Sequence, residues 1–64
     1  MLGMKVQQIL VENRHTGKVP RTMTALAAAI GISERMLYKI FEAPKPADVQ
    51  RIAKGLGVDP ALLN

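Results

Sequence analysis

Cysteine is absent from the 64-residue chain, and aromatic residues make up only 3% of it. Without thiols the chain forms neither a disulfide framework nor a thiolate metal site, and the single histidine, His15, has no second ligand at metal-binding spacing. The longest uncharged apolar stretch, residues 23–32, is far shorter than the roughly 18 residues of a membrane span. These absences predict a protein without a cofactor, a metal site or a membrane partner.

The first residues, Met1–Lys5, lack the charged start and the long apolar run of a signal peptide, which predicts a cytoplasmic protein. A chain this short accommodates one domain and buries only about 60% of the surface that it exposes when unfolded. Hydrophobic residues make up 48% of the chain, and the aliphatic ones recur at helical spacing with little strand-type alternation. We therefore expect a single all-α domain over residues 1–64 that depends on its aliphatic core.

Apolar residues at offsets of three and four predict a first helix over Met4–Arg14 and a loop over residues 15–21. Thr22 and Ser33 are predicted to cap the N-termini of a second and a third helix, and Gly31 to end the second one.

The C-terminal third of the chain carries signals for two further helices. Pro46 is suited to the first position of a fourth helix, and Gly57 to its end. Asp59-Pro60 repeats the pattern of a cap followed by proline and predicts a short fifth helix.

The charge balance and one tight turn point to a polyanionic partner. Nine Lys and Arg residues against five Asp and Glu residues give a formal net charge of +4, which suits nucleic acid. The second and third predicted helices are joined by a turn of about three residues around Gly31 and Ile32, which forces a steep crossing and makes the second helix of the pair project. This arrangement is a helix-turn-helix.

Residues 22–64 resemble the Cro and phage-repressor type of helix-turn-helix family, also described as the lambda-repressor-like DNA-binding domain. Within the motif, the match is carried by Leu26, Ala27, Gly31, Ile32, Leu37 and Ile40. Beyond it, the match continues through Lys45-Pro46, Arg51-Ile52-Ala53-Lys54-Gly55-Leu56-Gly57-Val58 and Asp59-Pro60-Ala61-Leu62-Leu63. The resemblance implies a compact five-helix fold in which helices 2 and 3 form the helix-turn-helix.

The resemblance also implies which residues read bases, namely Glu34, Arg35, Tyr38 and Lys39. An arginine at the start of the reading helix can donate two hydrogen bonds to one guanine, worth about 1–3 kcal/mol of discrimination, so Arg35 is the main candidate. Lys39 is expected to contact guanine or a phosphate, and Tyr38 a thymine methyl group or a phosphate. Glu34 has two open roles, because it can accept from cytosine N4 or only complement the helix dipole.

Phosphate contacts are expected near the ends of the motif elements, from Arg14, Lys18, Arg21, Thr22, Ser33 and Lys45. The sequence departs from the family at three places. Met23 stands where a phosphate-binding Gln is common, and Phe41 where a Glu commonly pairs with an Arg of helix 1, which would leave Arg14 free. The loop over residues 15–21 is longer than usual, and its cations either clamp a phosphate or are simply solvated.

Relatives of this kind bind as dimers to half-sites about 34 Å apart, so we expect a homodimer, at least on DNA, and a palindromic double-stranded operator. Leu62 and Leu63 are adjacent and cannot easily both face one core, so they are predicted at the dimer interface unless the terminus is frayed. The expected function is that of a Cro-like transcriptional regulator, and a repressor is expected because no activation domain is recognisable. The alternative is a protein-interaction or antitoxin-like module; an enzyme with a small-molecule substrate is not expected.

Overall fold

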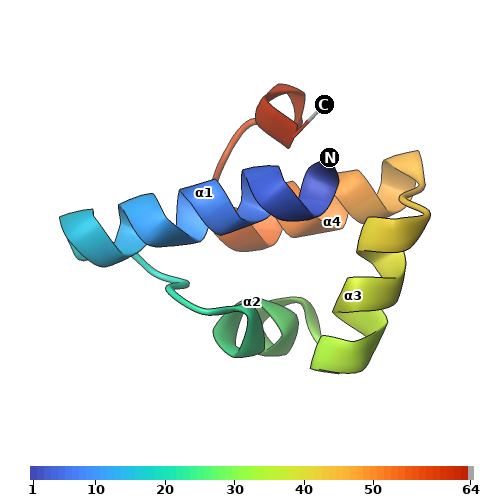
Figure 1. The fold of residues 1–64 in the computed structure, drawn as a ribbon, viewed down its shortest axis with the longest axis horizontal. Helices are drawn as coiled ribbons and strands as arrows, with labels where there is room; N and C mark the ends of the chain where they lie inside the picture. The colour runs from blue at the N-terminus through green and yellow to red at the C-terminus, as the bar shows by residue number, and fades with distance from the viewer. Residues whose placement is uncertain (64) are drawn as a thin grey trace.

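The computed structural model describes residues 1–63 and consists, over that range, of four α-helices and one 3-10 helix (Figure 1). The elements are α1 (Leu2–Thr16), α2 (Met23–Ile30), α3 (Glu34–Glu42), α4 (Pro46–Leu56) and η1 (Pro60–Leu63). The all-α class is confirmed. The predicted single domain and the family resemblance both extend to Asn64, which lies outside the described residues.

The expected short fifth helix is present as η1, a 3-10 helix of four residues, so residues 1–63 contain four α-helices and the predicted count of five holds only if η1 is included. The first turn of η1 is closed by a hydrogen bond from the Leu62 amide to the Asp59 carbonyl at 2.9 Å, three residues back in the chain. The Asp59 carboxylate also accepts from the Ala61 amide at 2.9 Å, as a capping residue does. Segments this short favour the tighter 3-10 geometry over an α-helix.

Helix α1 extends beyond the predicted Met4–Arg14 at both ends. It begins at Leu2 because the inward-facing side chains of Leu2, Val6 and Leu10 recur every four residues and are all buried. It continues through His15 and Thr16, which the sequence placed in the loop, and ends only at Gly17. That glycine adopts a left-handed conformation with φ of 76°, which closes the helix.

The predicted ends of the other helices are confirmed. The hydroxyl groups of Thr22 and Ser33 accept hydrogen bonds from amides in the first turns of α2 and α3, at 3.0 and 3.1 Å. Gly31 and Gly57 close α2 and α4 in the left-handed conformation, with φ of 77° and 72°. Pro46 occupies the first turn of α4, where its missing N–H costs no helical hydrogen bond.

One cluster of buried aliphatic side chains joins all five elements. Its members are Leu2, Val6, Leu10, Leu26, Ala27, Leu37, Ile40, Ile52, Ala53, Leu56 and Leu63. Figure 1 shows α1 running along one side of the molecule, with α2 and α3 at an angle to each other on the opposite side. The core thus packs against the buried sides of both α2 and α3. Among residues 1–63, no helix combines the length and the apolar character that crossing a bilayer requires.

Candidate nucleic-acid interface

The turn between α2 and α3 is held by backbone and side-chain hydrogen bonds. The Gly31 amide donates to the Ala28 carbonyl at 3.2 Å, and the Ile32 amide donates to the Ala27 carbonyl at 3.0 Å. From α4, the Arg51 guanidinium donates to the carbonyl of Ile30, the last residue of α2, at 3.2 Å. These bonds pair three of the four carbonyl groups that α2 leaves free at its C-terminus, and they hold the turn between α2 and α3.

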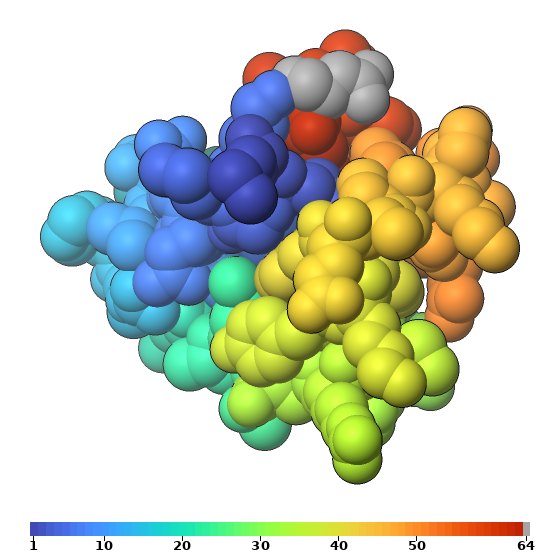
Figure 2. Space-filling view, turned by 45° about the vertical axis from the view of Figure 1, so that its right-hand side comes forward, coloured from blue at the N-terminus to red at the C-terminus, as the bar shows by residue number. Residues whose placement is uncertain are grey.

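Helix α3 has one buried and one exposed side. Leu37 and Ile40 face the core, while the side chains predicted to read bases all lie on the exposed surface: Glu34, Arg35, Tyr38 and Lys39. Figure 2 shows the residues of α3 forming the lower front of the molecule, between α1 and the start of α4. The structure therefore brings the four predicted residues together on one accessible helix.

The exposed side chains of α3 differ in how far they are fixed. Arg35 and Lys39 are one turn apart and so project from neighbouring positions on the same side of the helix. Tyr38 is half exposed, and its ring packs edge-on against Phe41 with ring centres 5.9 Å apart and planes at 76°. Glu34 is already engaged within the protein, because its Oε1 accepts a hydrogen bond from the Thr24 hydroxyl of α2.

The two capping hydroxyl groups lie at exposed helix N-termini, next to this surface. Thr22 and Ser33 use their oxygen atoms as acceptors for helix amides, and each hydroxyl keeps its O–H as a donor. The N-terminus of a helix is also the positive end of its dipole. Both residues therefore combine a free donor with a favourable electrostatic position for an anion.

The loop between α1 and α2 is tied down by its own polar side chains. Asn13, although polar, is only 6% exposed, and its Nδ2 donates to the Pro20 carbonyl at 2.8 Å. The Arg21 guanidinium donates to the carbonyls of Lys18 and Gly17, at 3.2 and 3.1 Å. At least one loop cation, Arg21, therefore binds the loop backbone. The loop cations are thus neither all surrounded by solvent nor all available to clamp a phosphate.

The expectation of a free Arg14 is wrong. The absence of a Glu at the Phe41 position predicted a free Arg14, but its Nη1 donates to the carbonyl of Arg21 at 2.7 Å. Both arginines thus stabilise the loop that leads into α2. Lys18 and Lys45, by contrast, are exposed at the two flanks of the motif.

Three residues with a part in this arrangement were missed by sequence reasoning, namely Thr24, Arg51 and, as a loop anchor, Asn13. Asn13 had a signal, since it continues the helical spacing of the buried stripe of α1. Thr24 and Arg51 had none, because their partners are 10 and 21 residues away and meet them only in the folded chain.

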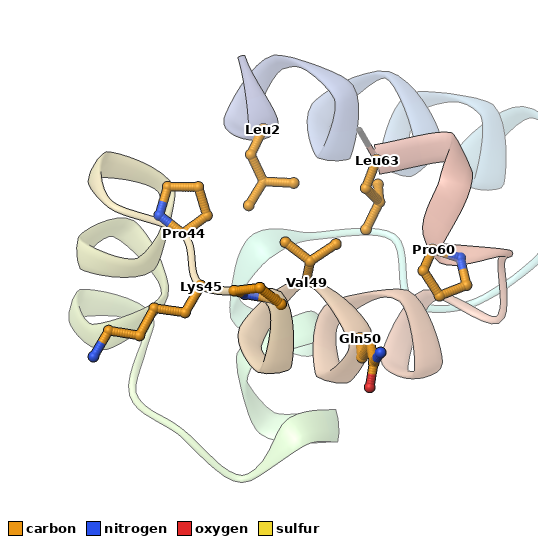
Figure 3. Close-up of a pocket in the computed structure, with 8 residues that line it drawn as sticks. Leu2, Pro44, Lys45, Val49, Gln50, Pro60 and Leu63 are labelled. Atoms are coloured by element: carbon orange, nitrogen blue, oxygen red, sulfur yellow. The ribbon is translucent and has the colours of Figure 1, made fainter.

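The two C-terminal leucines point in different directions. Leu62 is 61% exposed, whereas Leu63 is 4% exposed and packs inside the monomer, so of the two residues predicted at a dimer interface Leu62 is the one accessible to a partner. Leu63 also lines an open groove of about 440 Å³ between the starts of α1 and α4 and η1. Figure 3 shows Leu2, Val49 and Leu63 directed toward its interior, while the Lys45 side chain points away.

Comparison with known proteins agrees with this geometry. A family profile described as Helix-turn-helix matches residues 21–63, which include α2, α3, α4 and η1. Neither a curated protein nor a solved structure matches the chain. Within residues 1–63, no three His, Cys, Asp or Glu side chains are grouped so as to hold a metal ion. The match covers well over half of the chain, and the protein therefore belongs to the Cro/C1-type helix-turn-helix family of DNA-binding regulators.

Proposed function

We propose that the protein is a Cro-like transcriptional repressor that reads a double-stranded operator with α3. The observation that carries the proposal is the two-sided character of this helix. Leu37 and Ile40 hold it on the core, and Arg35, Tyr38 and Lys39 stand on its exposed side. A projecting helix of this width fits the major groove of B-form DNA, in which each base pair presents a distinct set of hydrogen-bonding groups.

The base contacts follow from the chemistry of each side chain. Arg35, in the first turn of α3, has the planar donor pair that matches O6 and N7 of a guanine. Lys39, one turn farther along, supplies a second cation for a guanine or a phosphate. The half-exposed ring of Tyr38 offers an apolar face to a thymine methyl group and a hydroxyl to a phosphate.

Phosphate contacts fix the position of the protein on the duplex. The hydroxyl groups of Thr22 and Ser33 are the donors at the helix N-termini, and Lys18 and Lys45 are the flanking cations. Arg14 and Arg21 act mainly on the protein itself by holding the loop in front of α2, although their charge adds to the field that attracts DNA.

The size of the molecule supports binding as a homodimer. Its principal dimensions are 29 × 23 × 17 Å, and half-sites one DNA turn apart are separated by roughly 34 Å, so two copies can lie side by side along the duplex. A closed two-fold dimer requires a patch that is complementary to itself. The proposed interface lies at η1, where Leu62 is exposed and Pro60 and Leu63 line the groove, and the proposed target is a palindrome.

The proposal is tested by selecting bound sequences from a random pool of double-stranded DNA and then measuring the affinity of variants for the selected operator. Arg35→Ala and Lys39→Ala are each expected to weaken binding by roughly 5- to 150-fold, the loss of one good base contact. Lys54→Ala is the matched control, because it removes the same charge from the exposed side of α4. If all three variants bind the operator as the unmodified protein does, α3 is not the reading helix.

A further inference from the structure

The first turns of α2 and α3 are joined by a hydrogen bond between two exposed side chains. Thr24 is the second residue of α2, and its hydroxyl donates to Oε1 of Glu34, the first residue of α3. The bond spans the helix-turn-helix on the surface that we propose to face DNA.

Helix capping does not account for this bond. The N-terminus of α2 is already capped by Thr22, and that of α3 by Ser33, each through its own side chain. The turn is closed separately by the backbone bonds of Gly31 and Ile32 and by Arg51. The pair of Thr24 and Glu34 is therefore free for a role other than ending a helix.

The effect of the bond on Glu34 is to order its carboxylate. A glutamate side chain on an exposed helix samples several rotamers and loses that freedom when it binds a partner. In this structure one carboxylate oxygen is held by Thr24, and the other remains an acceptor. An ionised carboxylate accepts hydrogen bonds but cannot donate them, and the donors that base pairs present in the major groove are the amino groups of cytosine (N4) and adenine (N6).

We propose that Thr24 is a positioning residue for specificity, which holds the Glu34 carboxylate ready to accept from the exocyclic amino group of a cytosine or an adenine. This inference rests on the proposed function, since it requires that α3 lie in the major groove. It also decides between the two roles that the sequence left open for Glu34, because a residue that only complements the helix dipole needs no fixed orientation.

The experiment is a selection of bound sequences from a random double-stranded DNA pool with the unmodified protein, Glu34→Ala, Thr24→Val and Thr24→Ser. Glu34→Ala is expected to relax the preference at one base position by at least about fivefold. Thr24→Val keeps the size of the side chain but removes the hydroxyl, so it should relax the same position, whereas Thr24→Ser keeps the hydroxyl and should retain the preference. The base favoured at that position distinguishes cytosine from adenine.

A matched control is Thr16→Val, because Thr16 is also exposed and its hydroxyl bonds only to the Glu12 carbonyl within α1. Thermal unfolding of each variant confirms that it is folded. The double variant Thr24→Val/Glu34→Ala should show no further relaxation beyond Glu34→Ala alone, as expected for two residues that act through one contact.

Two outcomes would overturn the inference. If Thr24→Val lowers affinity for every sequence alike, Thr24 binds a phosphate rather than Glu34; if Glu34→Ala relaxes no position, the carboxylate does not read a base. Failure of the proposed function looks different, since the unmodified protein would then select no sequence at all.

Discussion

Gly55 lies where α4 packs closely against Leu26 and Ile30 of α2. A Cβ atom at this position would lie 2.5 Å from Cγ2 of Ile30 and 3.2 Å from Cδ1 of Leu26. Leu26 is fully buried and Ile30 is half buried, so neither side chain can move far. The close approach of the two helices, on which the position of the helix-turn-helix depends, therefore requires glycine here.

Overpacking by the added Cβ of Gly55→Ala is accordingly expected to cost about 1–3 kcal/mol. The gain in helix propensity offsets about 1 kcal/mol of this cost, so the net destabilisation is expected to be up to about 2 kcal/mol. Urea unfolding of the variant measures the difference.

Gly3→Ala provides the comparison within α1. The nearest atom to a Cβ there is Cδ2 of Phe41 at 3.3 Å, the edge of a half-buried ring that can shift by a few tenths of an ångström. Because the ring can shift, the gain in helix propensity is kept, and the unfolding midpoint of Gly3→Ala should equal or exceed that of the unmodified protein. Equal midpoints for the Gly55 and Gly3 variants would show that the contact between α2 and α4 is looser than described.

The loop between α1 and α2 depends in the same way on Asn13. Its side chain is buried and donates to the carbonyl of Pro20, which is buried as well. Asn13→Ala leaves that carbonyl without its partner, and a buried acceptor left unpaired costs about 1–3 kcal/mol. Urea unfolding should detect this loss.

Gln8→Ala, on the exposed side of α1, is the control for the Asn13 variant and should change stability by less than about 0.5 kcal/mol. If both variants unfold at the same urea concentration, the loop is not anchored through Asn13.

The sequence predicted the helix ends well, because these depend on local chemistry. The residues that end or cap these helices each act on a backbone group within a few residues, so local sequence alone assigns their roles: Thr22, Ser33, Gly31 and Gly57. The start of α1 could not be predicted because no side chain caps it. The helix begins at Leu2 because that side chain is buried against elements that are distant in the sequence.

The candidate site was predicted as a set of exposed positions but not as a network. Helical spacing is enough to place Arg35, Tyr38 and Lys39 on one side of α3. It does not reveal that Arg14 binds the Arg21 carbonyl or that Thr24 holds Glu34, because such contacts depend on the angles between elements. The directions of long polar side chains were therefore the part that the sequence could not provide.

At the scale of the whole molecule, some apolar side chains are buried in the core of the monomer, and others stay exposed, where a partner can bury them. Leu63 completes the core of the monomer together with residues of α1 and α4, whereas Leu62, the preceding residue, is left exposed to solvent. Burying an exposed leucine is worth about 1.5–3 kcal/mol, and a two-fold dimer buries two of them. This is a substantial contribution for a molecule of this size.

Leu62→Gln is therefore expected to weaken dimerisation while leaving the monomer folded. Binding to a DNA containing the full palindrome should fall by at least about tenfold, the equivalent of 1.4 kcal/mol, because the two subunits no longer support each other's binding. Binding to a single half-site should be unchanged, since α3 and its contacts are intact. Met4→Gln, which alters another exposed apolar residue on α1, should affect neither DNA. Titration of both DNAs, together with sedimentation of the free protein, measures these effects; a Leu62→Gln variant that binds the full palindrome as tightly as the unmodified protein would place the dimer interface elsewhere.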